Sequence, residues 1–215
     1  MSRHVVVVDY GMGNLLSVQR GFQACDAEVE ISSDVDTIVH ADRLILPGVG
    51  AFKDGMHELK KLSLNDAIQE FVKTGRPLLG ICLGMQMLLD ESEEYGINKG
   101  LGFIPGRVVQ IPRNGPHENS KRKIPHIGWS AIKVSEGKKS WDGTVLQDVA
   151  EGEYFYFVHS FRAEPQDSCD VLAVCEYEAI EISAVIEREN VTGCQFHPEK
   201  SGQAGLSILR RFLYK

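Results

Sequence analysis

Pro77-Leu78-Leu79-Gly80-Ile81-Cys82-Leu83-Gly84-Met85-Gln86 determines the architecture around it. Its apolar first half predicts a buried strand, and from Leu83 onward the apolar side chains recur with helical spacing. The chain must therefore turn sharply at Cys82. A turn this tight requires neighbours without Cβ atoms, and Gly80 and Gly84 meet that requirement.

Cys82 has the setting of a nucleophile. The Gly-x-Cys-x-Gly turn is the cysteine counterpart of the serine nucleophile elbow, in which the reactive side chain stands on a strand-to-helix turn. The positive end of the helix dipole and a nearby histidine both favour a reactive thiolate. A buried structural cysteine is the alternative, but such a residue does not need a glycine two positions away on each side.

Two earlier segments repeat the pattern of a buried strand followed by a glycine-rich turn. Residues 4–10 lead into Gly11-Met12-Gly13-Asn14, and residues 43–46 lead into Pro47-Gly48-Val49-Gly50. In a parallel sheet such turns emerge at the carboxyl edge of the strands, where ligands of open α/β sheets bind. Helical patterns connect these strands. The sequence therefore predicts an α/β fold with an open, mostly parallel sheet and helices on both faces.

The C-terminal half consists of shorter apolar segments. Strands are predicted over 154–158, 169–177, 183–188 and 191–196, and an amphipathic helix over 201–215. Strands so close in sequence favour antiparallel pairing, so additional antiparallel strands are expected here. Because no linker or internal repeat interrupts the pattern, residues 1–215 are expected to form a single domain.

Composition excludes several classes of protein. A net charge of −7 argues against nucleic acid or an anionic membrane as a partner. No run approaches the roughly 18 apolar residues of a membrane span, and the first residues are too short for a signal-peptide core, so a cytoplasmic location is expected. The five cysteines form no CxxC pair, so neither disulfides nor a metal site is expected. A dinucleotide fingerprint would need glycine where Leu16 stands, and no cofactor is expected.

A second group of reactive side chains follows the predicted strand 191–196. His197 and Glu199 are two residues apart and therefore share one side of an extended chain. With Cys82 they can form a triad in which the cysteine is the nucleophile, the histidine is base and then acid, and the glutamate holds the imidazole. A structural histidine is the alternative reading of His197.

Three motifs together resemble the triad (class I) glutamine amidotransferases. They are Pro47-Gly48-Val49-Gly50, Gly80-Ile81-Cys82-Leu83-Gly84-Met85-Gln86 and Phe196-His197-Pro198-Glu199, in this order. The resemblance implies a flavodoxin-like α/β fold and an enzyme that hydrolyses L-glutamine and passes ammonia to a partner. It implies a catalytic triad of Cys82, His197 and Glu199. The residues implied to form the oxyanion site or to contact glutamine are Gly48, Val49, Gly50, Leu83, Gln86, Ser160 and Phe161.

Four further motifs resemble one branch of this family, the glutaminase subunits of imidazole glycerol phosphate synthases. They are Asp9-Tyr10-Gly11-Met12-Gly13-Asn14, Pro125-His126-Ile127-Gly128-Trp129, Tyr156-Phe157-Val158-His159-Ser160 and His197-Pro198-Glu199-Lys200-Ser201-Gly202. The branch implies a heterodimer with a (β/α)8-barrel cyclase/synthase that makes imidazole glycerol phosphate and AICAR in histidine biosynthesis. Apolar Ile127 and Trp129 are expected in the partner interface.

The sequence departs from the branch at two positions and leaves other functions open. Ser130 stands where the branch usually has asparagine, and Phe161 where tyrosine is common. One alternative is a paralogous subunit that supplies ammonia for sugar amidination in surface polysaccharide synthesis, to which the basic, exposed loop 113–123 could belong. Others are a stand-alone cysteine hydrolase, which would be active without a partner, and a non-catalytic binding subunit.

Overall fold

In the computed structural model, which describes residues 3–115 and 121–215, the apolar run before the reactive cysteine forms strand β4 (Leu78–Ile81). β4 lies between β3 (Leu44–Leu46) and β13 (Val191–Cys194) and runs parallel to both. All of its residues are buried. A strand with parallel neighbours on both sides is covered on both faces, which explains why its side chains are apolar without alternation.

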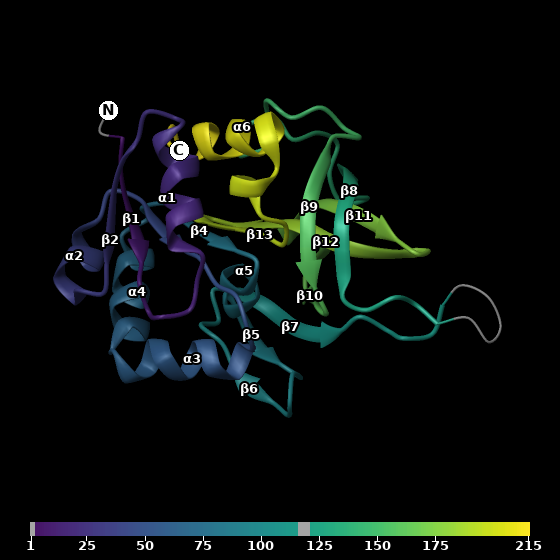
Figure 1. Ribbon diagram of the computed structural model, residues 1–215, viewed down its shortest axis with the longest axis horizontal. Coiled ribbons are helices and arrows are strands. Elements are labelled where there is room, and N and C mark those ends of the chain that lie inside the picture. The colour runs from purple at the N-terminus through teal and green to yellow at the C-terminus, as the bar shows by residue number, and fades with distance from the viewer. Residues whose placement is uncertain (1–2, 116–120) are drawn as a thin grey trace.

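These strands belong to a nine-stranded sheet (Figure 1). Its order is β2 (Glu28–Ser32), β1 (His4–Val8), β3, β4, β13, β12 (Ile180–Arg188), β11 (Val171–Tyr177), β8 (His126–Val134) and β9 (Tyr154–His159). Neighbours from β2 to β13 are parallel, and those from β13 to β9 are antiparallel. The predicted α/β sheet with antiparallel strands in the C-terminal half is confirmed. The sheet is mixed because tight turns, such as that at Glu178 and Ala179, join neighbouring strands antiparallel.

A smaller sheet of four strands completes the structure, in the order β10 (Phe161–Pro165), β7 (Ile104–Gln110), β5 (Leu89–Ser92) and β6 (Asn98–Lys99). The chain passes from the large sheet to the small one at Ser160, between β9 and β10. The sequence did not predict this second sheet, because its strands are short and their burial does not alternate regularly.

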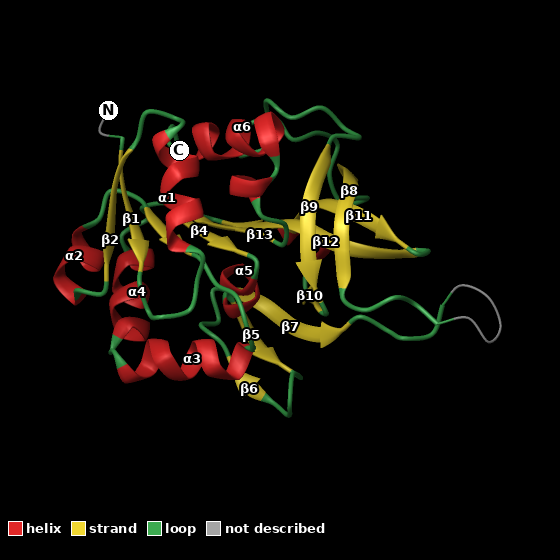
Figure 2. Cartoon of the chain, in the orientation of Figure 1, coloured by secondary structure: helices red, strands yellow, loops and turns green. Residues whose placement is uncertain are grey.

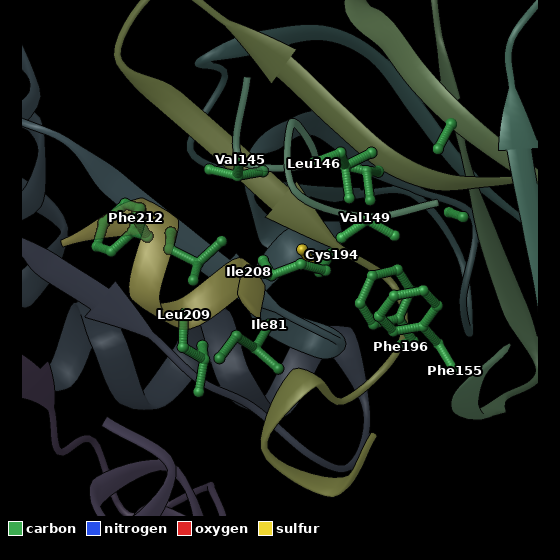
Figure 3. Packing of buried hydrophobic residues seen from close by; sticks show 14 of the residues in the cluster. Ile81, Val145, Leu146, Val149, Phe155, Cys194, Phe196, Ile208, Leu209 and Phe212 are labelled. Atoms are coloured by element: carbon green, nitrogen blue, oxygen red, sulfur yellow. The ribbon is translucent and has the colours of Figure 1, made fainter. Parts of the chain in front are cut away.

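Helices cover both faces of the large sheet, as predicted (Figure 2). Alternate valines of β1 point to opposite faces. One set packs with α1 (Leu15–Gln23) and α6 (Gly202–Phe212). Figure 3 shows the part of this cluster around Ile208, Leu209 and Phe212 of α6. The other set packs with α2 (Val35–His40), α3 (Phe52–Lys61), α4 (Leu64–Lys73) and α5 (Leu83–Met87). Two 3-10 helices, η1 (Ser168–Asp170) and η2 (Pro198–Lys200), lie between strands and before α6. Within the described residues, no helix has the length and apolar character of a membrane span.

The turn at Cys82 depends on its two glycines. Cys82 has φ 56° and ψ −111°, a conformation that residues with side chains rarely adopt. A Cβ on Gly84 would lie 1.8 Å from the carbonyl oxygen of Leu46, and a Cβ on Gly80 would lie 2.8 Å from the backbone of Gly84. The start of α5 therefore packs directly against the end of β3, and no larger residue fits at either glycine.

The basic loop before β8 differs from its prediction in one respect. Arg122 is not exposed but 7% accessible, and its guanidinium donates hydrogen bonds to the carbonyls of Pro112 (2.7 Å) and Glu178 (3.1 Å). Carbonyl oxygens are the acceptors that satisfy a buried arginine. Arg122 thus ties the base of the loop 113–123 to the turn between β11 and β12. Residues 116–120 of the predicted loop lie outside the described residues.

Replacing Gly84 with alanine is expected to destabilise the protein by about 1–3 kcal/mol or more, because the added Cβ would overlap the Leu46 carbonyl. Urea unfolding followed by circular dichroism measures the change. Lys53→Ala, on the exposed side of α3, is the matched control and is expected to change stability by less than about 0.5 kcal/mol. Equal stability of Gly84→Ala and wild type would contradict the packing argument.

Candidate active site

Cys82 lies in a pocket of about 330 Å³ that opens beyond the carboxyl end of β4. A pocket of this size suits a small polar substrate. The predicted site residues that line it are Val49, Gly50, Cys82, Leu83, Gln86, Ser160, Phe161 and His197. The structure therefore brings together residues from both halves of the chain. Glu199 lies behind His197, and Gly48 contacts the backbone of Leu83.

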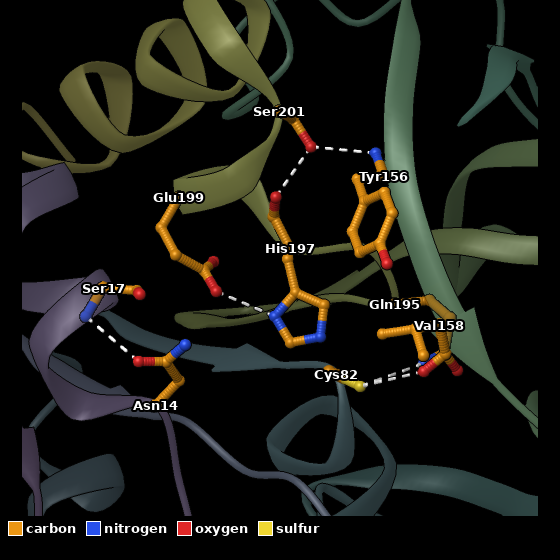
Figure 4. Close-up of polar contacts among 9 residues, drawn as sticks. All are labelled: Asn14, Ser17, Cys82, Tyr156, Val158, Gln195, His197, Glu199 and Ser201. Atoms are coloured by element: carbon orange, nitrogen blue, oxygen red, sulfur yellow. Dashed lines mark hydrogen bonds and ion pairs between the residues drawn. The ribbon is translucent and has the colours of Figure 1, made fainter. Parts of the chain in front are cut away.

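His197 lies between Glu199 and Cys82, with Nε2 on the side of the cysteine (Figure 4). Its Nδ1 is 2.8 Å from Oε1 of Glu199, and both side chains are almost completely buried. Burial by itself lowers the pKa of His197, but the side chains of Cys82 and Glu199 outweigh it and raise the pKa to about 9. A protonated imidazole beside a thiol favours the thiolate, which is the nucleophilic form. The geometry therefore suits a nucleophile with its proton carrier.

Strand β9 holds the histidine in place. The backbone N–H of His197 donates to the carbonyl of Tyr156 (3.0 Å). Ser201 Oγ accepts from the backbone N–H of Tyr156 (3.0 Å) and donates to the carbonyl of His197 (2.7 Å), as Figure 4 shows. Sequence reasoning assigned no role to Ser201, although it lies in one of the quoted motifs. A hydroxyl can donate and accept at once, and serine is the smallest residue that carries one.

Two glutamines connect Cys82 with the opposite wall of the pocket. Gln86 Nε2 donates to the carbonyl of Phe161 and to Oε1 of Gln195, both at 3.0 Å. Gln195 Nε2 in turn lies 4.0 Å from Cys82 Sγ. Gln195 is fully buried and was not predicted as a site residue, because a glutamine next to a strand carries no chemical signal in the sequence.

The turn after β3 lies next to the Cys82 elbow, and its Gly48 carbonyl binds the backbone N–H of Leu83. This N–H was expected to stabilise the oxyanion. The N–H of Leu83 donates to the carbonyl of Gly48 at 3.4 Å. Tyr10 Oη donates to the carbonyl of Pro47 at 2.7 Å and holds the start of the turn. Burial raises the pKa of Tyr10, and Cys82 raises it further, so the phenol keeps its proton as a donor. In this conformation the amide of Leu83 does not point to an open site.

Glu94 is a pocket residue that sequence reasoning missed. Its carboxylate accepts from the backbone N–H of Phe52 at 2.6 Å, and the residue is 9% exposed. It lies in an acidic segment that reads as ordinary surface, so its signal was lost among its neighbours. A buried carboxylate in a pocket can bind an ammonium group.

Ile127 and Trp129, the predicted partner contacts, lie on an exposed part of β8. They are 58% and 54% accessible, and Tyr154 on β9 is 59% accessible. Trp129 packs edge-on against Tyr156, with ring centroids 6.0 Å apart. Ile127 pairs with Val158, which lines the pocket. This exposed apolar face is thus adjacent to the pocket, and such faces are typical of protein contacts.

The site as a whole has the components of acyl transfer through a thiol. It has a nucleophile on an elbow, an oriented histidine and a backbone turn rich in amides. No group of three or more metal-ligating side chains occurs among the residues that the structure describes.

Residues 6–215 match the model of the family described as Glutamine amidotransferase class-I. The chain belongs to this family. The resemblance predicted from the cysteine and histidine motifs is therefore confirmed, and the chain is a glutamine-hydrolysing amidotransferase.

Relatives of this amidotransferase match it over almost its full length. It is 50% identical over 209 residues to the imidazole glycerol phosphate synthase subunit HisH 1 of Legionella pneumophila (strain Lens), covering 97% of this chain and 98% of the relative. It is 45% identical over 207 residues to the subunit HisH of Geobacillus thermodenitrificans (strain NG80-2), covering 96% and 93%. The predicted resemblance to this branch of the family is confirmed.

Solved structures support the fold of the amidotransferase. A crystal structure of a glutamine amidotransferase superposes with a TM-score of 0.72 at 17% identity, covering 97% of both chains. The structure of PurLQS from Thermotoga maritima gives a TM-score of 0.70 at 19% identity, covering 100% of this chain and 99% of that one. At these identities the likeness concerns the fold alone.

A diazo ketone analogue of glutamine is expected to label Cys82, because this thiol alone lies in the pocket beside His197. Mass spectrometry of the labelled peptides identifies the site, and Cys82→Ser should abolish both labelling and glutaminase activity. Burial raises the pKa of Cys175 to about 12 and also raises that of Cys194, so these thiols should not react. Labelling at the exposed Cys169 instead would contradict the assignment.

Both Glu199→Gln and His197→Ala are expected to lower kcat, but kcat of Glu199→Gln should remain about tenfold or more above that of His197→Ala. The glutamate orients the imidazole and does not itself transfer a proton. The rate of glutamate release by each variant measures both losses. Urea unfolding of each variant serves as the control for folding. Equal losses in the two variants would show that the division of roles is wrong.

Proposed function

We propose that this chain is the glutaminase subunit of an imidazole glycerol phosphate synthase. It hydrolyses L-glutamine to glutamate and ammonia and passes the ammonia to a (β/α)8-barrel cyclase/synthase in a heterodimer, which makes imidazole glycerol phosphate and AICAR for histidine biosynthesis. The observation that carries the proposal is 45–50% identity, over nearly the full length, to proteins named HisH, combined with Cys82 and His197 at one pocket and Glu199 hydrogen-bonded to His197.

Hydrolysis proceeds in two steps in this proposal. The Cys82 thiolate attacks the side-chain amide carbon of glutamine, and His197 delivers its proton to the nitrogen as the C–N bond breaks. Ammonia leaves and a γ-glutamyl thioester remains. His197 then takes a proton from water, which attacks the thioester, and cleavage of the C–S bond releases glutamate and restores the thiolate. Glu199 holds the imidazole in the tautomer that both steps require.

Three features of the pocket support glutamine as its ligand. The carboxylate of Glu94 is complementary to the α-ammonium group. The backbone at Ser160 and Phe161 and the side chain of Gln86 line the same wall and can contact the polar groups of the amino acid. Cys82 lines the same pocket, so a glutamine whose α-ammonium group binds Glu94 can present its side-chain amide to the thiol.

The Pro47-Gly48-Val49-Gly50 turn provides a device that keeps the isolated subunit inactive. The Gly48 carbonyl accepts the N–H of Leu83, which would otherwise stabilise the oxyanion. Gly50 has φ 102°, where glycine is favoured, so a peptide in this turn can rotate at low cost. Val49 is 42% exposed and also lines the pocket. A partner that contacts the turn can therefore change which backbone N–H points toward the substrate.

Glutamate release is expected to be slow for the isolated chain and about 10²- to 10³-fold faster with the synthase partner and its acceptor substrate, because an oxyanion donor is worth about that factor. Trp129→Ala should weaken association with the partner and leave basal turnover unchanged. Leu62→Ala, at an exposed site after α3, is the matched control.

Two outcomes would overturn this proposal. Equal turnover with and without the partner would favour the stand-alone hydrolase. Activation by a sugar-amidinating synthase, and not by the cyclase, would favour the polysaccharide paralogue.

A further inference from the structure

A pair of buried histidines lies outside the triad; His159 lines the pocket, and His126 lies behind it. His126 on β8 and His159 at the end of β9 are directly opposite each other in the strand pairing. They are 1% and 6% exposed, and His126 Nδ1 lies 3.0 Å from His159 Nε2. Two polar rings in a buried position need hydrogen-bond partners, and here the direction of each hydrogen bond determines whether the next nitrogen donates or accepts.

The chain of contacts begins at the carbonyl of Phe161. His159 Nδ1 lies 2.8 Å from this oxygen, and Gln86 Nε2 lies 3.0 Å from it. A carbonyl oxygen only accepts hydrogen bonds, so both nitrogens must donate to it. The oxygen lies where the chain leaves β9 and begins β10, at the passage from the large sheet to the small one. Two side chains thus hold one backbone group at this junction.

The tautomers of both rings follow from the hydrogen bond that His159 Nδ1 donates to the Phe161 carbonyl. In a neutral His159 with a proton on Nδ1, Nε2 has a lone pair and accepts from His126 Nδ1. Nε2 of His126 then has a lone pair as well, and it accepts from Ser130 Oγ at 2.9 Å. The direction of every hydrogen bond from Ser130 to Phe161 is therefore fixed.

The surroundings keep both rings neutral. His126 is stacked between Phe157 (centroid distance 4.9 Å) and Tyr177 (4.0 Å). Burial lowers the pKa of His126 to about 4. Burial is also the main cause that lowers the pKa of His159 to about 3; the hydrogen bond to the Phe161 carbonyl opposes this lowering, and the neighbouring His126 and His197 add to it. A proton added to Nε2 of His159 would face the N–H at Nδ1 of His126. A proton added to Nε2 of His126 would remove the acceptor for the hydroxyl of Ser130.

We propose that His126 and His159 are positioning residues for glutamine binding, which hold the Phe161 carbonyl as the fixed acceptor that orients Gln86 and the adjacent pocket wall. The proposal rests on the glutaminase function proposed above. The orientation continues beyond Gln86, because its amide directs Oε1 of Gln195 and thereby turns Nε2 of Gln195 toward Cys82. Loss of the histidine donor removes one of the two groups that fix this arrangement.

Kinetics of two variants of His159 test the proposal. Asparagine places a side-chain N–H near the position of Nδ1 and can still donate to Phe161, whereas leucine fills the space without a donor. In the complex with the synthase partner, His159→Leu is expected to raise KM for glutamine about tenfold, with a smaller change in kcat, since one buried hydrogen bond contributes about this factor. His159→Asn is expected to restore KM to within about threefold of wild type. A general structural role would not distinguish the two variants in this way.

The ring tautomers supply a measurement that does not depend on any variant. Nitrogen-15 NMR of the full-length protein is expected to show a protonated Nδ1 and a bare Nε2 on both His126 and His159. Ser130→Ala should shift the Nε2 resonance of His126, from which it removes a donor, more than that of His159. A protonated Nε2 on either ring, or a doubly protonated ring at neutral pH, would overturn the proposal.

The outcomes separate this inference from the function on which it rests. An active wild-type complex together with an unchanged KM in His159→Leu, or an equal rise in His159→Asn, would overturn the positioning role alone. Absence of glutamate release by the wild-type complex would overturn the glutaminase function and the positioning role together.

Discussion

The close approach of α5 to β3 is the contact on which the rest of the site depends. Because Gly84 has no side chain, the carbonyl of Leu46 can lie against the first turn of the helix, and Cys82 is held in a conformation unfavourable for a residue with a Cβ. The same approach brings the turn that follows Leu46 to the amide of Leu83. One steric constraint therefore presents the thiol and also places beside it the Gly48 carbonyl, which accepts the N–H of Leu83.

Parallel pairing of β4 with β13 brings two segments that are far apart in the sequence together at this point. The backbone N–H of Cys82 donates to the carbonyl of Cys194 at 2.8 Å, so the segments after both strands emerge at one edge of the sheet. His197 consequently reaches the thiol from a part of the sequence more than a hundred residues away. Ser201 and β9 then fix the histidine, so its position does not depend on the short helix η2 alone.

The pocket wall that contains Phe161 is formed where the two sheets meet. Phe161 starts a strand of the small sheet, and its carbonyl accepts hydrogen bonds from a helix residue, Gln86, and a strand residue, His159. The chain of hydrogen bonds through the two histidines ends at Ser130, which is next to the exposed Trp129. The face expected to bind the synthase and the wall expected to bind glutamine are thus neighbouring parts of one hydrogen-bonded structure, in which β8 and β9 provide the rigid support.

The sequence alone determined the elbow at Cys82, the parallel half of the sheet and the pairing of His197 with Glu199, because glycine spacing, apolar runs and residues two apart are local properties of a chain. It could not indicate Glu94 or Gln195, since burial turns an ordinary polar residue into a site residue and burial depends on distant segments. The second sheet, the hydrogen bond from Leu83 to Gly48 and the contact between the buried His126 and His159 were likewise decided only by tertiary structure. Each requires groups far apart in sequence to meet within hydrogen-bonding distance, and no local pattern specifies which groups will meet.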